Sequence, residues 1–321
     1  MINLHNSELS SSYAVGIDIG GTSLKCGLVN EEGKILLSFL VPLQNARTQE
    51  EIIQLIADAI NQCTLQLKKP IAGVGIGFPG LVENGVIIGG ADNLPGFEEL
   101  PLDIILNELT GHTIVIDNDA NLMGLGELTY GAAKDCTDAV FLTVGTGIGG
   151  AILIDKKLYG GFNNRGGELG HIIIQQNGLA CTCGGRGCLE AYASVTALID
   201  DYKSQNKFSS EEVDGKYIVE KYLNGEEYAV RAMERHFDSL ATGIASFINI
   251  CSPQKVIIGG GISEAGTFYI DELRYRTKTL SIPAASIHTQ IVAAKLGNQA
   301  GILGCTANVF QKLKMEHYET K

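Results

Sequence analysis

The N-terminal part of the chain alternates short apolar runs with polar turns that contain glycine. Tyr13–Asp18 is apolar up to its last residue and predicts a buried strand, and Leu24–Val29 predicts a second strand after a Gly/Thr turn. Lys34–Val41 predicts a third strand, so the three form a meander. Further along, the pattern predicts strands at Ala72–Gly77 and Thr113–Ile116, a helix that begins with a Thr48–Glu51 capping box, and helices over Pro101–Gly111 and Ala120–Tyr130.

Two stretches of the chain repeat one pattern. Ala14–Val29 (AVGIDIGGTSLKCGLV) and Ala139–Ile154 (AVFLTVGTGIGGAILI) each contain an apolar strand, a Gly/Thr turn and a second apolar strand. Two unrelated hairpins remain an alternative, because the identity between the stretches is low. The favoured interpretation is a duplicated domain in which each copy opens with a strand, a glycine turn and a strand.

The second half of the chain is richer in helical patterns and contains no low-complexity linker. Apolar residues at helical spacing predict helices at Leu189–Tyr202, Glu226–Asn249, Glu264–Leu280 and Asn298–Lys312. Lys255–Ile258 predicts a short buried strand that runs into three glycines. The boundary between two domains therefore has to be placed by pattern, and we place it at Asp119, shortly before the second copy of the repeat.

Composition and charge narrow the classes of function. The chain has 321 residues, enough for two domains, and a net charge of −12 from 24 basic and 36 acidic residues. This excess of negative charge repels polyanions and disfavours binding of nucleic acid or of an anionic membrane. The N-terminus has no signal-peptide pattern, and no run approaches the roughly 18 apolar residues of a membrane span. We therefore expect a cytoplasmic protein without persistent disulfides.

The glycine turn of the second copy matches a dinucleotide-binding motif in the wrong context. Gly145–Gly150 has the spacing G-x-G-x-x-G, and Glu168 follows about 20 residues later. That motif has to open a helix, whereas here Ala-Ile-Leu-Ile continues as a strand, which disfavours a Rossmann fold. The chain also contains no P-loop motif, which disfavours that class of nucleotide hydrolase.

The matched pair of glycine turns indicates a different kind of nucleotide site. Backbone N–H groups without side chains can approach phosphate oxygens, so two such turns could hold a polyphosphate from two sides. Asp18 is an acid at the same position and would require a cation beside it, directly or through water. Plain tight turns remain the alternative. The candidate phosphate-binding residues are Asp18, Gly20, Gly21, Thr22, Lys25, Gly145, Thr146 and Gly147.

One histidine and three cysteines form a second pattern with recognisable chemistry. The spacing His-x9-Cys-x-Cys-x4-Cys supplies one imidazole and three thiols, which is a ligand set of closed structural zinc sites. A redox or nucleophilic cysteine is the alternative. The candidate ligands are His171, Cys181, Cys183 and Cys188, and the other five cysteines lie in apolar patterns typical of core residues.

Asp119 lies where a strand gives way to a helix, between Asn118 and Asn121. An aspartate in such a position is commonly a helix N-cap. It could also be the base that phosphoryl transfer to a hydroxyl requires. The residues alone leave both interpretations open.

The order of these motifs along almost the whole chain resembles the ROK family (repressors, uncharacterised open reading frames and sugar kinases) of the actin/hexokinase/Hsp70 superfold. The element GELGH (Gly167–His171), followed by the cysteine cluster, is the most specific of them. The other matching motifs are DIGGTSLK (Asp18–Lys25), FPG (Phe78–Gly80), NLPG (Asn93–Gly96), DNDAN (Asp117–Asn121), Leu142–Gly150, Cys181–Glu190 and GGGIS (Gly259–Ser263).

The resemblance implies an α/β protein with two actin-like (ribonuclease H-like) domains around a central cleft, which closes on ATP and a sugar. The smaller N-terminal α/β domain would comprise residues 1–118 and 300–321, because the C-terminal helix returns to it. The larger C-terminal α/β domain would comprise residues 119–299 and carry the zinc loop. The resemblance also favours a homodimer.

The resemblance assigns roles to individual residues. Asp119 matches the catalytic base that accepts the proton of the sugar hydroxyl. Mg²⁺ would bridge the phosphates of ATP near Asp18, and Zn²⁺ would be structural. The implied sugar-binding residues are Gly80, Asn93, Asn118, Asp119, Glu168, His171 and Glu190, and Gly259, Gly260 and Gly261 would lie against the adenosine.

The implied function is an ATP-dependent hexokinase that phosphorylates the 6-hydroxyl of an aldohexose, with glucose as the favoured substrate. N-acetylmannosamine kinase and fructokinase remain alternatives, because the chain departs from the family pattern at Phe97 (often Trp), at Leu122–Gly124 (usually Ala-rich) and at Thr182 (commonly Gly). The alternative outside the enzymes is a sugar-responsive transcriptional regulator that lacks its DNA-binding domain. The negative net charge and the short segment before the first strand disfavour it.

Overall fold

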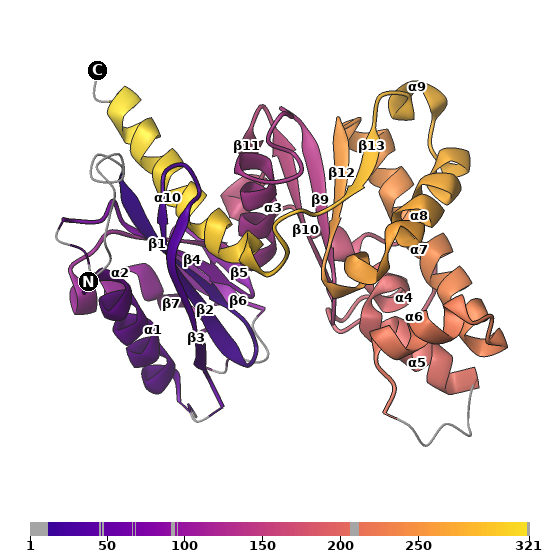
Figure 1. The fold of residues 1–321 in the computed structure, drawn as a ribbon, viewed down its shortest axis with the longest axis horizontal. Helices are drawn as coiled ribbons and strands as arrows, with labels where there is room; N and C mark the ends of the chain where they lie inside the picture. Colours follow the sequence, from indigo (N-terminus) through magenta and orange to yellow (C-terminus); the bar gives the residue numbers. More distant parts are fainter. Residues whose placement is uncertain are drawn as a thin grey trace. The chain divides into compact units, whose positions relative to one another are not determined.

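The computed structural model describes residues 12–44, 46, 48–65, 67, 69–90, 94, 96–205 and 212–319, and the chain folds into two compact units (Figure 1). The first unit consists of Met1–Lys134, Leu158–Gly166 and Asn298–Lys321. The second consists of Asp135–Lys157 and Gly167–Gly297. Each unit is an α/β structure with its own five-stranded sheet and its own apolar core.

The sheet of the first unit has the strand order β3-β2-β1-β4-β8. β1 pairs antiparallel with β2 and parallel with β4, and β4 pairs parallel with β8, so the meander at one edge gives way to parallel strands. The predicted strands are confirmed, with the bounds β1 Tyr13–Ile19, β2 Ser23–Asn30, β3 Ile35–Pro42, β4 Val74–Phe78 and β8 Ile114–Asn118.

The strand β1 is mostly apolar because both of its faces are covered, and every residue of this strand is buried. Val15 and Ile17 belong to the core that α1 (Gln49–Thr64) covers with its apolar face. Ala14, on the alternate set of positions, packs with residues of α10 (Ala300–Glu319), which covers the opposite face (Figure 1). The predicted capping box begins α1, with Thr48 and Glu51 bonded to each other's backbone N–H.

The helix α10 approaches the sheet so closely that strand residues without a side chain are required. A Cβ on Gly75 would lie 2.0 Å from the carbonyl oxygen of Cys305, and one on Gly16 would lie 2.4 Å from that of Ile302. The same helix packs on α3 (Asp119–Thr129), where a Cβ on Gly304 would lie 1.7 Å from the carbonyl oxygen of Leu122. The C-terminal helix therefore packs against the sheet of the first unit.

The bounds of the two units differ from those that the sequence pattern predicts, because α3 packs on α10. The pattern places the boundary at Asp119, whereas α3 and the residues up to Lys134 lie in the first unit. The segment Leu158–Gly166 also lies there, because Asn164 donates to the carbonyl oxygen of Val82 at 3.0 Å. The chain therefore passes between the units four times instead of twice.

Three short strands of the first unit carry no repeating pattern, and the sequence did not predict them. A three-stranded sheet in the order β5-β6-β7 follows β4 along the chain. The helix α2 (Leu102–Thr110) was predicted, and it ends at Gly111 in the left-handed conformation (φ 72°). The three short strands are β5 Leu81–Glu83, β6 Val86–Gly89 and β7 Leu100–Pro101.

The sheet of the second unit repeats the strand order of the first, and its strands β10, β9, β12 and β13 repeat the directions of β2, β1, β4 and β8. Its order is β11-β10-β9-β12-β13, with β9 antiparallel to β10 and parallel to β12, and β12 parallel to β13. The repeated pattern of the sequence thus corresponds to a repeated topology. The bounds are β9 Ala139–Val144, β10 Ile148–Ile154, β11 Lys157–Leu158, β12 Lys255–Gly259 and β13 Gln290–Ala293.

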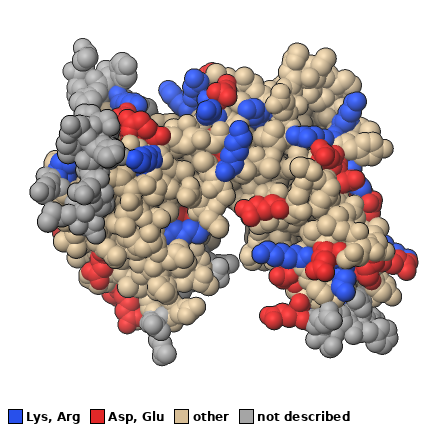
Figure 2. Space-filling model, viewed as in Figure 1, with Lys and Arg blue, Asp and Glu red and all other residues tan. Residues whose placement is uncertain are grey.

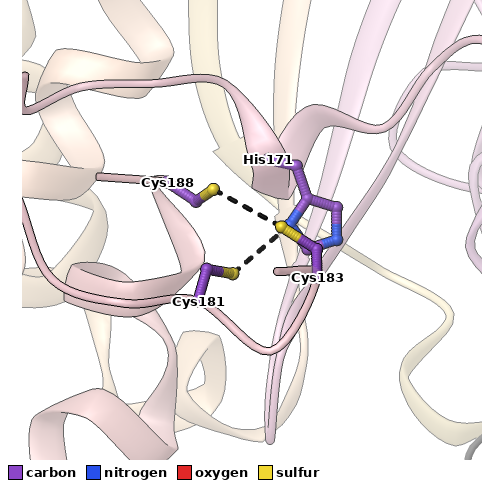
Figure 3. A group of neighbouring side chains, drawn as sticks. All are labelled: His171, Cys181, Cys183 and Cys188. Carbon is purple, nitrogen blue, oxygen red and sulfur yellow. Dashed lines mark hydrogen bonds between the residues drawn. The ribbon is translucent and has the colours of Figure 1, made fainter. Parts of the chain in front are cut away.

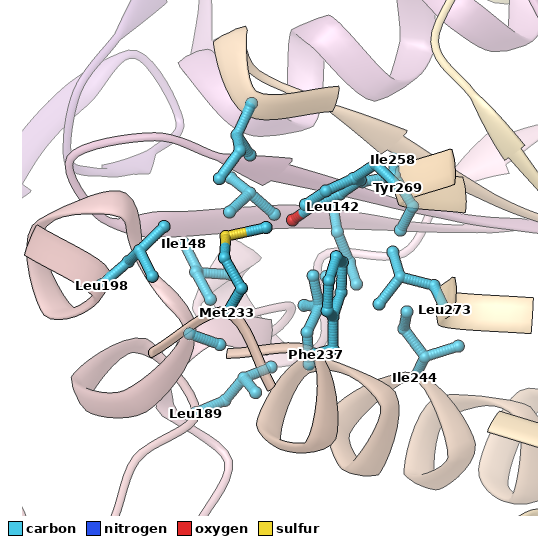
Figure 4. Packing of buried hydrophobic residues seen from close by; sticks show 14 of the residues in the cluster. Leu142, Ile148, Leu189, Leu198, Met233, Phe237, Ile244, Ile258, Tyr269 and Leu273 are labelled. Carbon is cyan, nitrogen blue, oxygen red and sulfur yellow. The ribbon is translucent and has the colours of Figure 1, made fainter. Parts of the chain in front are cut away.

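Helices of the second unit pack on its sheet around an apolar core (Figure 4). The core joins Leu142 and Ile258 of the strands to Met233 and Phe237 of α7, and to Tyr269 of α8. The helices are α4 Glu190–Ala193, α5 Val195–Gln205, α6 Gly215–Leu223, α7 Glu227–Cys251, α8 Thr267–Leu280 and α9 Pro283–Ser286.

Two predicted helices of this unit have different bounds in the structure. The single helix expected at Leu189–Tyr202 is broken at Ser194, whose backbone is extended (φ −71°, ψ 161°) and whose hydroxyl accepts from the N–H of Ala197. The helix expected from Glu264 begins at Thr267, after Gly266 with φ 129°. In both places a capping geometry interrupts an apolar pattern that runs through it.

Charged side chains of both signs are interspersed on the face shown in Figure 2. Among the ion pairs of the second unit, Arg276 of α8 pairs with Glu234 of α7 at 2.8 Å and with Glu272 of its own helix at 3.1 Å. Within the described ranges, no helix is both long enough and apolar enough to cross a membrane.

We expect Gly75→Ala to lower the free energy of unfolding by about 3 kcal/mol, because the new methyl group would overlap the α10 backbone, which cannot rotate away. Gly261→Ala is the matched control, since a Cβ there meets no atom within 4 Å. Urea denaturation of both variants measures the difference. Equal stability of the two variants would contradict the close packing of α10 on β4.

Candidate active site and metal centre

The structure distributes the predicted site residues over both units. The first unit carries Asp18, Gly20, Gly21, Thr22, Lys25, Gly80, Asn118 and Asp119. The second carries Gly145, Thr146, Gly147, Glu168, His171, Cys181, Cys183, Cys188, Glu190, Gly259, Gly260 and Gly261. Asn93 lies outside the described residues.

The acids of the first unit gather at the carboxyl ends of three neighbouring strands. Asp18 pairs in register with Gly77 of β4, and Gly77 pairs with Asp117 of β8, directly before Asn118 and Asp119. The carboxyl ends of parallel strands meet at one edge of a sheet, which is where α/β folds place their ligands. The predicted phosphate-binding acid and the predicted base therefore lie at the same edge of one sheet.

Asp18 is a buried acid that is paired with a basic residue. Its Oδ2 lies 3.0 Å from Nζ of Lys25, the residue opposite it in the β1–β2 register. The helix α10 covers it, since a Cβ on Gly301 would lie 2.4 Å from the Asp18 carboxyl carbon. A glycine at position 301 thus makes room for the acid, and Lys25 compensates its charge.

Asp119 is the first residue of α3, and its environment raises its pKa. Burial of the carboxyl and the neighbouring charge of Asp18 raise the pKa from 3.8 to about 7, against hydrogen bonds from backbone N–H groups, including that of Ala120, and the charge of Lys25. The N-cap of the helix is Asn118, whose side chain accepts from the N–H of Asn121 at 3.1 Å. The cap interpretation of Asp119 is therefore wrong, and its carboxyl is a titratable group near neutrality.

Asp117 fixes the geometry of this edge. Its Oδ1 accepts from the backbone N–H of Asn118 at 2.7 Å and from the side-chain amides of Asn121 at 3.1 Å and Asn164 at 3.2 Å. The side-chain amide of Asn118 in turn donates to the carbonyl oxygen of Gly80 at 3.1 Å. Sequence reasoning missed Asn164, because no motif marks it. In the structure its backbone is left-handed (φ 58°), a conformation that Asn adopts more readily than most residues.

The glycine turn of the second unit connects β9 to β10. The N–H of Gly145 donates to the carbonyl oxygen of Gly147 at 3.0 Å, which closes the turn. A Cβ on Gly145 would meet no atom within 4 Å, so this position is open to a ligand. A Cβ on Gly147 would lie 2.4 Å from Oε2 of Glu190, so here the glycine makes room for a carboxylate.

The three glycines Gly259–Gly261, at the end of β12 and directly after it, also differ in whether a Cβ would meet protein atoms or open space. A Cβ on Gly260 would lie 2.1 Å from the carbonyl oxygen of Val144, and one on Gly259 would lie 3.0 Å from the ring of Phe141. Both glycines are therefore explained by packing against β9. Gly261 faces open space and is the one of the three that a ligand could approach without displacing protein atoms.

The predicted metal ligands lie together in the second unit (Figure 3). The four donor atoms are within 4.8 Å of one another, with Nδ1 of His171 3.6 Å from Sγ of Cys181, and Sγ of Cys183 3.7 Å from Sγ of Cys188. Tetrahedral zinc with Zn–S of about 2.3 Å and Zn–N of about 2.0 Å separates neighbouring ligands by about 3.6–3.8 Å. The donor set and its spacing therefore fit a closed zinc site.

Backbone hydrogen bonds hold the cysteine loop in this shape. The N–H of Cys181 donates to the carbonyl oxygen of Gly185, and that of Gly184 donates to the carbonyl oxygen of Cys181, both at 3.0 Å. A Cβ on Gly187 would lie 1.9 Å from the carbonyl oxygen of Gln175, so only glycine fits there. Hydrogen bonds of its own backbone therefore close the loop.

The predicted sugar ligands of this unit have different surroundings. Glu168 is exposed, directly before the short 3₁₀ turn Leu169–His171. His171 directs Nδ1 toward the thiols, which leaves Nε2 for another partner. Glu190, the first residue of α4, is half-buried and accepts from the N–H of Ile148 at 2.9 Å.

Comparisons with known proteins find relatives of one family that match nearly the whole chain. The ROK family model matches residues 14–312. A glucokinase of Thermotoga maritima is 36% identical over 312 residues, which cover 93% of this chain and 98% of that protein. A putative xylose repressor of Caldicellulosiruptor sp. is 32% identical over 313 residues, which cover 93% of this chain and 78% of that protein.

A crystal structure of a protein from the same family is also similar to this chain over nearly its whole length. The ROK family glucokinase from Streptomyces griseus, in complex with glucose and AMPPNP, is 32% identical with a TM-score of 0.80 and covers 94% of this chain and 100% of that one. The predicted fold class, α/β with two actin-like domains, is confirmed by this similarity.

We expect Asp119→Asn to stabilise the folded protein above pH 7. A carboxyl whose pKa is raised from 3.8 to about 7 holds its proton in the folded state and loses it in the unfolded state. Wild-type stability should therefore fall as pH rises from about 4 to about 7, by about 2–4 kcal/mol at 1.36 kcal/mol per pKa unit. Asparagine cannot ionise, so the variant should escape this loss.

Urea denaturation at pH 4.5 and pH 8 tests this expectation. Asp103→Asn is the control, because Asp103 accepts from the N–H of Ile104 on α2 at 2.8 Å, as Asp119 does from Ala120 on α3. A wild-type protein no less stable than Asp119→Asn at pH 8 would show that burial does not raise this pKa.

We expect about one zinc per chain in protein purified without chelator, measured by elemental analysis. Cys188→Ser should lose the metal and lower the melting temperature, because a closed site needs all four ligands. Cys251→Ser should retain it, since Cys251 is a half-buried cysteine on α7 outside the cluster. Metal-free wild-type protein with an unchanged melting temperature would rule out the site.

Proposed function

Because the chain belongs to the ROK family, we propose that it is an ATP-dependent sugar kinase that phosphorylates the 6-hydroxyl of an aldohexose, with glucose as the favoured substrate. Two relatives support this choice, since one is named a glucokinase and the other was crystallised with glucose and AMPPNP.

The observation that carries the proposal is the state of Asp119. A base that accepts the proton of a sugar hydroxyl works best with a pKa near the pH at which it operates. Burial and the nearby Asp18 raise the pKa of Asp119 to about 7, so both protonation states are populated near neutrality. The carboxyl lies at the sheet edge where α/β proteins bind ligands, and its helix is capped by another residue.

The remaining predicted residues take the following roles in the proposal. The backbone N–H groups of the two glycine turns bind phosphate oxygens, and Lys25 adds a positive charge. Asp18 would hold Mg²⁺, directly or through water, to neutralise the charge of the phosphates. The sugar is oriented by Gly80, Asn93, Asn118, Glu168, Nε2 of His171 and Glu190.

Zinc would be held by His171 and the three thiols, and it would fix the loop that carries them. It supplies no reacting atom in this proposal, because a site closed by four protein ligands leaves no position for a substrate. The imidazole bound through Nδ1 would present Nε2 in one fixed orientation, which restricts the position of a sugar hydroxyl that it contacts.

A regulatory function is the second candidate, because a relative of similar identity is named a putative xylose repressor. Such a protein would bind a sugar without transferring a phosphate. N-acetylmannosamine and fructose remain alternative substrates, since Leu122–Gly124 directly follow the proposed base on α3 and depart from the family pattern.

A coupled assay of ADP release with glucose, mannose, fructose, N-acetylglucosamine and N-acetylmannosamine tests the proposal. We expect turnover with at least one aldohexose, and the highest kcat/KM with glucose. Asp119→Asn should lower kcat by about 10²–10⁴-fold, because the general base is lost. The affinity for the sugar, measured by calorimetry, should change little.

Asp103→Asn is again the control and should keep wild-type turnover. Near-normal kcat in Asp119→Asn would overturn the role of this residue. Sugar binding without ADP release by the wild-type protein, together with salt-sensitive binding to DNA, would favour the regulatory function.

A further inference from the structure

The Glu190 carboxylate bonds two segments of the second unit that are distant in sequence. Its Oε2 accepts from the N–H of Ile148 at 2.9 Å, at the end of the glycine turn. Its Oε1 accepts from the hydroxyl of Thr182 at 3.2 Å, and Thr182 lies between two of the metal-binding cysteines. The same Oε1 is 3.7 Å from Sγ of Cys181. One side chain thus joins the cysteine loop to the glycine turn.

The turn and the carboxylate fit each other closely. Any side chain at Gly147 would collide with Oε2 of Glu190, which a Cβ would approach to 2.4 Å. The glycine at position 147 is therefore explained by the carboxylate, whereas Gly145 remains open to a ligand. A hydrogen bond from a backbone N–H to a carboxylate is stronger than one between neutral groups, so this contact holds the turn in one conformation.

Two further bonds tie the turn to the segment that follows Glu190. The N–H of Val195 donates to the carbonyl oxygen of Gly145 at 2.8 Å, and the hydroxyl of Thr196 donates to that of Thr146 at 2.8 Å. The residues 190–196 that hold the turn come directly after the last cysteine of the loop, Cys188. The conformation of the turn therefore depends on the position of this segment, which begins at the cysteine loop.

We propose that Glu190, held by Thr182, is a positioning residue for the glycine turn Gly145–Ile148, so that the cysteine loop sets the affinity of this turn for nucleotide. The inference rests on the proposed kinase function. It adds to the sugar contact expected of Glu190, because a carboxylate has about four acceptor positions and the two bonds leave some free.

Thr182→Val tests the link, because valine keeps the shape of threonine and removes the hydroxyl. We expect its dissociation constant for AMPPNP with Mg²⁺, measured by calorimetry, to rise about three- to tenfold. Hydrogen exchange of the peptide that spans residues 145–150 should become faster, since Ile148 loses a well-placed acceptor. Thr182→Ser keeps the hydroxyl and should behave as wild type, and Glu190→Gln should weaken nucleotide binding like Thr182→Val.

Two controls separate this role from others. Thr242→Val removes a hydroxyl on α7 that bonds its own helix at Asp238, and it should leave nucleotide affinity and exchange unchanged. Glu168→Gln alters the exposed predicted sugar ligand and should weaken glucose binding without affecting AMPPNP. The zinc content of Thr182→Val should equal that of the wild type, so that any change reflects the hydroxyl rather than loss of metal.

Unchanged AMPPNP affinity in Thr182→Val and Glu190→Gln would overturn the proposal, and so would a loss of glucose affinity alone. Treatment with 1,10-phenanthroline provides an independent readout. Removal of the metal should accelerate exchange at residues 145–150 in the wild type, and protection that persists without metal would contradict the link. Absence of AMPPNP binding to the wild-type protein would overturn the kinase function as well, which distinguishes the two failures.

Discussion

The contact between the α10 backbone and strands β1 and β4 is the constraint on which the first unit depends. Carbonyl oxygens of the helix lie where side chains of Gly16 and Gly75 would otherwise be, so helix and sheet meet without intervening side chains. The alternate positions of β1 that face this helix include Asp18, which Gly301 of the helix accommodates. Burial of Asp18 follows from this packing, and its charge in turn helps to raise the pKa of Asp119. Burial of the Asp119 carboxyl is the larger cause of its raised pKa, and the packing of α10 adds to it through Asp18.

The second unit uses glycine for a similar purpose in its site. Gly147 admits the Glu190 carboxylate to the backbone, and Gly260 admits the turn after β12 to the carbonyl oxygen of Val144. In both units, backbone and carboxylate groups of the predicted site residues approach one another where a Cβ is absent. Backbone groups held in this way lose little conformational entropy when a phosphate binds, which favours tight binding by small contacts. The close approaches therefore stabilise the fold and would also make the proposed ligand sites rigid.

The sequence predicted those features that local pattern determines. The strands of the repeat, the capping box at Thr48 and the proximity of His171 to the three cysteines depend on spacing over a few residues, and the structure has all of them. The missed features depend on contacts between distant segments. The placement of Leu158–Gly166 with the first unit depends on bonds such as that from Asn164 to Val82, and the strands β5 to β7 are too short to carry a pattern. The bond from Ile148 to Glu190 spans 42 positions, and no motif marks it.

The four passages of the chain between the units have a consequence for biosynthesis. The second unit ends at Gly297, so a ribosome has made all of its residues before it begins α10. At about 5–20 residues per second, the 20 residues of α10 take about 1–4 s to synthesise. During this interval one face of the β1–β4 sheet, including Ala14, has no cover. The unit that is translated first is therefore completed last, and one face of its sheet stays accessible to other chains while the second unit and then α10 are made.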